Sequence, residues 1–167
     1  MELSEFDIPS PLGTLRMSVS DQGLRSLLYH DGIIGEMTTL PQELLPGQNT
    51  LQFELMQRVS LQLAEYFSNA REAFDIPLDL EGTTFQLGVW NKLQDIRFGF
   101  TKSYTEFARD CGDVLGVRAV ASANGKNPVA IIVPCHRVVG ADGALRGYNG
   151  GLNRKMWLLR HEGVMML

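Results

Sequence analysis

Residues 127–140 read NPVAIIVPCHRVVG. The run from Val129 to Val133 is apolar throughout, which predicts a buried segment, and it ends shortly before Cys135. A thiol becomes a strong nucleophile once it is ionised, and both an imidazole and a guanidinium favour ionisation of a nearby thiol. His136 and Arg137 directly follow the cysteine and supply those two groups. This stretch predicts a core segment that ends in a candidate nucleophile.

Two interpretations of Cys135 stay open from residue types alone: a reactive thiol, or a small buried core residue beside an incidental histidine. Adjacent side chains in an extended chain point to opposite faces, so Cys135 and His136 can cooperate only across a turn or a bridging water. Cys111 is expected to be non-catalytic, and His30 and His161 structural or exposed. The two cysteines and three histidines form no paired CxxC and HxxxH set, so we expect no structural zinc and no cofactor.

Helix signals precede the central stretch. Thr83-x-x-Gln86 has capping-box form and opens a predicted helix, and Ser103-x-x-Glu106 opens a second, short one that ends near Asp110. Residues 115–124 predict a third helix, stopped by Gly125. The apolar face expected for the first of these helices consists of Phe85, Val89, Leu93 and Ile96.

The second and third of these helices are joined by a turn that contains Gly112. Two short helices with such a turn form a helix-turn-helix candidate, although ordinary helical hairpins share the pattern. After the central stretch, glycines at 140, 143, 147, 150 and 151 predict a loop-rich region. Asn153 is then expected to cap a final helix that ends at Gly163.

The first half of the chain has β signals followed by one helix. Leu15–Val19 and Leu24–Tyr29 are predicted strands, each preceded by a turn sequence. The Gly- and Pro-containing residues 31–49 are expected to be irregular. An amphipathic helix of about 18 residues follows, with an apolar face of Leu51, Leu55, Met56, Val59, Leu63 and Phe67. Residues 74–82 are the best candidate boundary, which divides the chain into domains 1–80 and 81–167.

The two halves have net charges of opposite sign, which the net charge of the whole chain does not reveal. The 167 residues carry a net charge of −4. Residues 1–80 contain 4 Lys+Arg and 12 Asp+Glu, giving −8, and residues 81–167 contain 11 and 7, giving +4. A polyanionic partner would therefore meet the second half. No apolar run reaches the roughly 18 residues of a membrane span, and the acidic N-terminus is unlike a signal peptide, so we expect a cytoplasmic protein.

The central stretch, together with Gly147-Tyr148-x-Gly150-Gly151 and Lys155-x-Trp157-Leu158-Leu159-x-His161-Glu162-Gly163, closely resembles the O6-alkylguanine-DNA alkyltransferase family. The resemblance is dense from Phe85 to Gly163 and weaker before it. It implies an α+β chain in two parts. The first is a ribonuclease-H-like α/β domain with a small antiparallel sheet. The second is a mostly helical domain that carries a helix-turn-helix, the DNA-binding surface and the alkyl acceptor.

The resemblance also implies roles for individual residues. Cys135 matches the alkyl acceptor, and His136 and Glu162 match the pair that withdraws the thiol proton through a water and holds the sulfur ionised. Asn127 matches the brace of the turn beneath the cysteine, and Tyr104 the tyrosine that crowds the target phosphate and offers its hydroxyl to guanine. The implied base pocket is formed by Val138, Tyr148, Asn149 and Lys155, and the implied DNA contacts by Arg118, Ala119, Ser122, Ala123 and Tyr104.

The implied function is single-turnover repair of O6-alkylguanine, with O4-alkylthymine as a further possible substrate. The protein would act as a monomer on double-stranded DNA from the minor groove, flip the nucleotide, and let Arg118 take the space of the extruded base. Two other classes remain: a module that only recognises alkylated DNA, and a cysteine hydrolase using Cys135 and His136. The cysteine argues against the first, because related non-catalytic proteins lack it. The sequence departs from the family pattern at Thr84, Arg97, Gly116 and Val117, and Asn124 and Asn149 occupy positions that help to shape the pocket or its approach. These departures leave the chemistry intact and bear on substrate range and DNA affinity.

Overall fold

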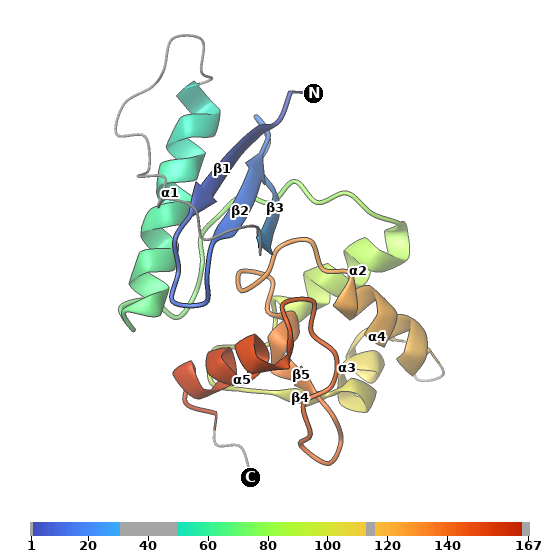
Figure 1. Ribbon diagram of the computed structural model, residues 1–167. Coiled ribbons are helices and arrows are strands. Elements are labelled where there is room, and N and C mark those ends of the chain that lie inside the picture. The colour runs from blue at the N-terminus through green and yellow to red at the C-terminus, as the bar shows by residue number, and fades with distance from the viewer. Residues whose placement is uncertain (1, 31–49, 113–115, 165–167) are drawn as a thin grey trace. The chain divides into compact units, whose positions relative to one another are not determined.

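The computed structural model describes residues 2–30, 50–112 and 116–164 (Figure 1). The chain divides into two compact units, Met1–Leu80 and Glu81–Leu167. Within the described residues, no helix combines the length and the apolar character needed to cross a membrane.

The first unit contains an antiparallel sheet of three strands in the order β1-β2-β3. The strands are β1 (Ser4–Ile8), β2 (Leu15–Val19) and β3 (Leu24–Tyr29). The bounds predicted for β2 and β3 are confirmed. β1 was not predicted, because its two inward candidates, Phe6 and Ile8, alternate with acidic residues in a segment that otherwise signals solvent exposure.

Helix α1 (Thr50–Phe67) is 18 residues long, as predicted, and runs alongside the sheet (Figure 1). Its buried face includes Phe53, Met56, Val59, Leu63 and Tyr66. The predicted face was wrong at its start, because Leu51 is 62% exposed. Phe53, which the predicted face omitted, is 6% exposed and enters the core, while Met56, Val59 and Leu63 are buried as predicted. The expected irregular segment 31–49 lies outside the described residues.

The last residues of the first unit return to β3. Leu24 donates its N–H to Pro77 O at 2.8 Å, and Asp79 donates to Leu24 O at 3.0 Å. The backbones approach so closely that a Cβ on Gly23 would lie 2.6 Å from Pro77 O, which explains the glycine there.

The second unit is mostly helical, as expected. Its elements are α2 (Thr84–Leu93), β4 (Lys102–Ser103), α3 (Tyr104–Asp110), α4 (Val117–Gly125), the 3-10 helix η1 (Cys135–Arg137), β5 (Val138–Val139) and α5 (Leu152–His161). Both predicted capping boxes are formed, by Thr83 with Gln86 and by Ser103 with Glu106. The residues that join α3 to α4 include 113–115, which lie outside the described residues, as does Leu115, the predicted start of the third helix.

Three predictions about the helices of the second unit were wrong. Helix α2 ends at Leu93, so Ile96 packs from the following turn, and Phe85 is 42% exposed. Helix α5 begins at Leu152 with Gly151 as its N-cap and no side-chain cap, so Asn153 is already helical. Gly151 has φ of 88°, a conformation that disfavours other residues and sets the entry of the chain into the helix.

A short parallel pairing ties the central stretch to the start of α3. Lys102 is opposite Val138 and Ser103 is opposite Val139. Because η1 ends at Arg137 and α3 begins at Tyr104, this pairing brings the cysteine-containing turn close to the tyrosine. Residues 129–133 are buried, as predicted, and form turns rather than a strand.

Candidate active site

The chain turns at Cys135. Residues 135–137 form η1, in which Cys135 N donates to Val133 O at 2.9 Å and Arg137 N to Pro134 O at 3.0 Å. In a 3-10 turn successive side chains diverge by roughly 120° instead of pointing to opposite faces. Cooperation between Cys135 and His136 required a turn or a bridging water, and this turn is present. Both side chains are buried.

Asn127 holds the segment that leads into this turn. Its Nδ2 donates to Val133 O at 2.7 Å and to Val129 O at 3.2 Å, and its Oδ1 accepts from Val129 N at 3.0 Å. The segment needs such support because Ile131 has φ of 70°, a strained conformation for a β-branched residue. These hydrogen bonds join Asn127 to both ends of the segment that leads into the turn.

His136 and Arg137 share one carboxylate. Nε2 of His136 lies 2.7 Å from Glu162 Oε1. Arg137 donates two hydrogen bonds to the same carboxylate, from Nε to Oε2 at 2.9 Å and from Nη2 to Oε1 at 3.0 Å. Its Nη1 donates to Ile96 O at 2.5 Å. Burial raises the pKa of Glu162, but hydrogen bonds and charge from His136 and Arg137 outweigh it and lower the pKa to about 2. Glu162 is therefore an anion.

The anion fixes the tautomer of His136. Nε2 carries the proton toward Glu162, so Nδ1 presents its lone pair. That Nδ1 atom is buried and has no hydrogen-bond partner within the described residues. Burial lowers the pKa of His136, against the opposing effect of Glu162, and Arg137 and Lys155 lower it further. The arrangement is a neutral imidazole with a free basic nitrogen.

Cys135 does not carry the charge that the family resemblance implies for it. Burial raises the pKa of the Cys135 thiol, while a hydrogen bond from Asn127 and the charge of Lys155 lower it only in part. The expectation of a sulfur held ionised is thus corrected for the free protein, because removing the thiol from water costs the thiolate more than its neighbours return. The resting group is a thiol beside a base.

Lys155 is fully buried and binds three carbonyl groups. Its Nζ donates to Val138 O at 2.6 Å, to Arg146 O at 2.9 Å and to Gly147 O at 3.2 Å. Burial lowers its pKa to about 8, with Cys135 acting in the opposite direction. Lys155 thus links β5, the strand after η1, to the glycine-rich loop.

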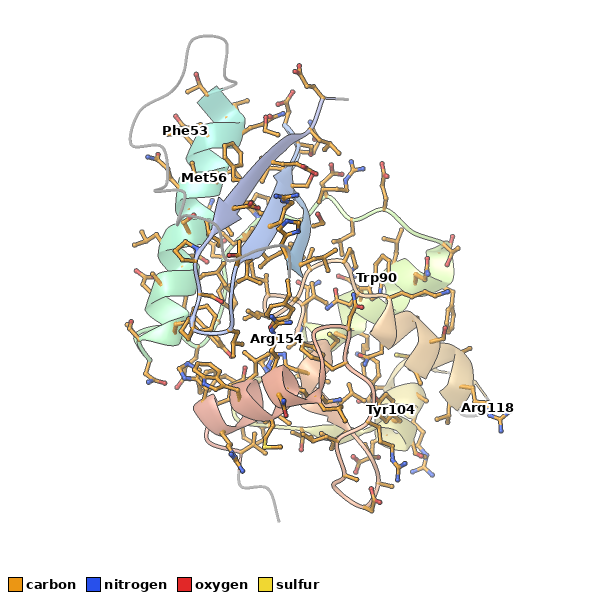
Figure 2. All side chains as sticks on the ribbon, viewed as in Figure 1. Phe53, Met56, Trp90, Tyr104, Arg118 and Arg154 are labelled. Carbon is orange, nitrogen blue, oxygen red and sulfur yellow. The ribbon has the colours of Figure 1, made fainter. Side chains whose placement is uncertain are left out.

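Tyr104 lies at the start of α3, where the β4–β5 pairing places it next to this loop (Figure 2). Its hydroxyl donates to Arg146 O at 2.9 Å, and the Lys155 ammonium is 5.7 Å from its ring centre. Burial raises the pKa of Tyr104, as does Cys135, and Asn124 and Arg146 partly oppose that shift. The phenol is therefore a neutral hydrogen-bond donor close to the cysteine.

The remaining predicted site residues fall into two groups. Val138 and Lys155 are buried beside the turn, whereas Tyr148 is half-buried and Asn149 exposed on the loop. On α4, the exposed side chains are Arg118, Ala119 and Ser122, and Figure 2 shows Arg118 projecting outward. The structure does not bring Ala123 to this exposed face: it is 3% exposed, and its carbonyl accepts from Trp90 Nε1 at 2.8 Å.

Two polar residues at the centre of the site, Arg137 and Asn124, were not predicted to lie there. Arg137 was noted only as a nearby charge, and Asn124 only as a residue that shapes the pocket. Asn124 is 3% exposed, and its Nδ2 lies 3.4 Å from Cys135 O. The helical spacing of Val120, Ala123 and Asn124 could have predicted the burial of Asn124, because the three residues share one buried face of α4.

Within the described residues, no cluster of three or more His, Cys, Asp or Glu side chains is arranged to hold a metal ion. What the site contains is a buried thiol, a neutral imidazole with a free nitrogen, and a phenol that can donate. Together these groups can remove a proton from sulfur on one side and supply one on the other.

Comparison with known proteins places both units. Residues 7–80 match the family model of the 6-O-methylguanine DNA methyltransferase ribonuclease-like domain, and residues 84–164 match that of its DNA binding domain. A methylated-DNA--protein-cysteine methyltransferase of Methanosarcina acetivorans is 40% identical over 154 residues, 92% of this chain and 94% of that protein. Its counterpart in Mycolicibacterium paratuberculosis is 54% identical over 155 residues, 93% and 89% of the two chains.

Solved structures agree with this placement. The Mycobacterium tuberculosis O6-methylguanine methyltransferase superposes with a TM-score of 0.78 at 40% identity, covering 96% of this chain and 93% of that one. The structure of Mycobacterium tuberculosis OGT in complex with DNA superposes with a TM-score of 0.76 at 42% identity, covering 93% and 90%.

Proposed function

The chain belongs to the 6-O-methylguanine DNA methyltransferase family, and we propose that it repairs DNA by transferring the alkyl group of O6-alkylguanine to its own Cys135. The observation that carries this proposal is the buried Cys135 turn, braced by Asn127 and followed by the His136–Glu162 pair. The acceptor is part of the protein, so the reaction balances without a cofactor.

In the proposed step, Cys135 Sγ attacks the alkyl carbon, the S–C bond forms and the C–O6 bond breaks. The thiol proton passes through a water to Nδ1 of His136, and Glu162 stabilises the imidazolium that results. The guanine leaves as an anion and gains a proton from the Tyr104 hydroxyl. A thioether has no low-energy route to hydrolysis, so each chain reacts once.

The raised pKa of Cys135 fits this coupling. A permanently ionised buried thiol would react with any small electrophile that reached it. A thiol that loses its proton only as the S–C bond forms reacts when an alkylated base is seated in line with the sulfur. Asn127 and Lys155, which favour the thiolate, keep that proton loss within reach.

DNA is the partner, and we place it on the exposed face of α4. Helices α3 and α4 act as a helix-turn-helix whose second helix enters the minor groove, where Ala119 and Ser122 are small enough to allow close approach. Arg118 fills the space left by the flipped nucleotide, which offsets a cost of a few kcal/mol. The net charge of +4 on residues 81–167 favours binding to phosphate.

The flipped base would lie between Tyr104, Val138 and the loop that carries Tyr148 and Asn149. Lys155 holds that loop against the strand after the catalytic turn, so it shapes the pocket without touching the reacting atoms. We assign DNA binding and alkyl acceptance to residues 81–167 and a structural role to residues 1–80. We propose a monomer acting in the cytoplasm on O6-alkylguanine, with O4-alkylthymine as a secondary substrate.

The test is intact mass after incubation with a duplex that contains O6-methylguanine. Each chain should gain one methylene, and Cys135→Ala should gain none. Cys111→Ala is the matched control, because that free thiol lies at the end of α3 and has no place in the mechanism. Binding without a mass gain would instead indicate a recognition module, and repeated turnover of a soluble ester would indicate a hydrolase.

A further inference from the structure

Arg146 belongs to the glycine-rich loop, and its backbone borders the pocket proposed for the flipped base. Its carbonyl accepts hydrogen bonds from Tyr104 Oη and from Lys155 Nζ, both at 2.9 Å. Lys155 also donates to Val138 O at 2.6 Å, which joins the Arg146 backbone to β5. The side chain of Arg146, by contrast, is 64% exposed. Arg146 therefore lies at the rim of the pocket, with its backbone fixed and its guanidinium in solvent.

An ion pair within the loop holds that guanidinium. Nη2 of Arg146 donates to Asp142 Oδ2 at 3.2 Å, and Asp142 Oδ1 accepts from Ala144 N at 3.0 Å. Gly140 N donates to Ala144 O at 2.8 Å and closes the turn. A Cβ on Gly140 would lie 2.6 Å from Asp142 Oδ1 and 3.0 Å from Arg146 Nε, so glycine leaves the room that the pair occupies. The loop thus keeps the guanidinium at a defined place on the rim.

Stability accounts for little of this pair. Its two side chains are 64% and 59% exposed, and ion pairs in solvent stabilise a fold only slightly. The backbone of the turn and the bond from Ala144 N to Asp142 close the loop without Arg146. The bond to Asp142 engages Nη2, and the planar guanidinium carries further N–H donors. Arg146 can therefore bind a second anion while it remains in contact with Asp142.

The proposed function brings phosphates to this rim. A base seated between Tyr104 and Val138 stays attached to its strand through the sugar, so the adjoining phosphates lie at the mouth of the pocket. Arginine suits such a group, because its planar fork of donors matches two phosphate oxygens at once. The guanidinium of Arg146 and the phosphates of the flipped nucleotide therefore meet at the same place.

We propose that Arg146 binds a phosphate next to the flipped nucleotide, and that Asp142 holds its guanidinium in place on the rim before DNA arrives. The inference rests on the proposed function, and it adds a backbone contact from the loop to the contacts assigned to α4. The contact carries no sequence information, as repair of damage in any sequence requires.

Single methylphosphonates test the contact directly, because each one removes the charge of one phosphate. Binding is measured with O6-methylguanine duplexes in the Cys135→Ala background, so that transfer does not follow. A methylphosphonate at one of the phosphates that flank the lesion on its own strand should weaken binding about 10-fold. Arg146→Gln should weaken binding to the unmodified duplex by about the same factor. In that variant, the same methylphosphonate should have no further effect, because its partner is gone.

Salt dependence gives a second readout. Arg146→Gln should reduce the slope of log Kd against log salt concentration by about 1, the value for one lost phosphate contact. Arg146→Lys keeps the charge and should retain most of the slope. Arg58→Gln is the matched control, because Arg58 is also an exposed arginine paired with an aspartate, Asp75, but lies on α1 in the first unit. It should change neither the affinity nor the slope.

Two results would overturn the proposal for Arg146. One is a set of methylphosphonate effects that all persist in Arg146→Gln, as expected if the residue only shapes the loop. The other is a salt slope that Arg146→Gln leaves unchanged. Both would leave the alkyl transfer intact. Failure of the unaltered protein to gain one methylene from the O6-methylguanine duplex would instead overturn the proposed function, so the two failures are distinguishable.

Discussion

The two units of this protein differ in how deeply the ion pairs compared here are buried. In the first unit, Arg16 and Asp7 form an ion pair at 2.7 Å with side chains 40% and 29% exposed. In the second, Glu162 binds Arg137 and His136 with side-chain exposures of 0%, 7% and 0%. Exposed pairs contribute little to stability, and buried pairs are costly to desolvate. The second unit therefore keeps a costly arrangement, which the proposed chemistry explains.

The largest expected effect is on the stability of the second unit. Arg137→Met leaves Glu162 buried with a single partner, and we expect it to destabilise the unit by about 3–5 kcal/mol. Both tryptophans, Trp90 and Trp157, lie in this unit, so urea unfolding followed by tryptophan fluorescence reports on it directly. A loss below about 1 kcal/mol would show that the buried pair behaves like a surface pair.

Acid should remove the contribution of Glu162. Its folded-state pKa of about 2 lies below the usual glutamate value of 4.5, so the unfolded chain binds the proton more readily. The stabilisation is present above the usual value and is lost as pH falls from about 4.5 toward 2. Its size is on the order of 3 kcal/mol. The stability difference between the wild-type protein and Glu162→Gln should narrow across that window, and a constant difference would contradict a depressed pKa.

Glu162 should also matter for the rate. In Glu162→Gln, His136 keeps a hydrogen-bond partner but loses the anion that stabilises its protonated form. We expect alkyl transfer to slow by about 100-fold, with little change in DNA affinity. Stopped-flow transfer from a labelled duplex and a separate binding titration measure the two quantities. A loss of DNA affinity that accounts for the slower rate would place Glu162 in DNA binding instead.

The exposed face of α4 provides the contrast within the second unit. Arg118→Ala should slow transfer from duplex DNA by about 10-fold and spare free O6-benzylguanine, because only the duplex requires a flipped nucleotide. Ser122→Ala, one turn along the same face, is the matched control for general DNA contact. Equal losses on both substrates would contradict the role proposed for Arg118.

The smallest effect belongs to the first unit. Arg16→Met breaks the Asp7 pair on the sheet surface and should change stability by less than about 1 kcal/mol. Thermal unfolding by far-UV circular dichroism, at low and high salt, checks this. A loss as large as that of Arg137→Met would remove the distinction between the units.

Local signals predicted much of the fold from the sequence. Turn residues bounded β2 and β3, and reciprocal caps set the starts of α2 and α3, because these features depend on neighbours a few residues apart. β1 and the N-cap of α5 were missed. The acidic alternation around Phe6 hides the strand, and Gly151 caps through its backbone conformation instead of a side chain.

The site shows the same limit. The sequence predicted that Cys135 lies at the end of a buried run and that a turn is needed for it to cooperate with His136. His136 and Arg137 both bind the carboxylate of Glu162, which is 26 and 25 residues away in the chain. These contacts depend on how α5 packs on η1, so the sequence did not predict them together. The ionisation of the thiol was also beyond the sequence, because burial decides it.

The central claim is that Cys135 rests as a neutral thiol and loses its proton only during transfer. Thiolate absorbance followed against pH in Cys111→Ala, which leaves Cys135 as the only thiol, measures this directly. Our account predicts an apparent pKa above the usual cysteine value, in a protein that nevertheless takes one methyl group per chain from damaged DNA at neutral pH. A thiolate already formed below pH 7, of about the kind found in permanently activated cysteines, would contradict it.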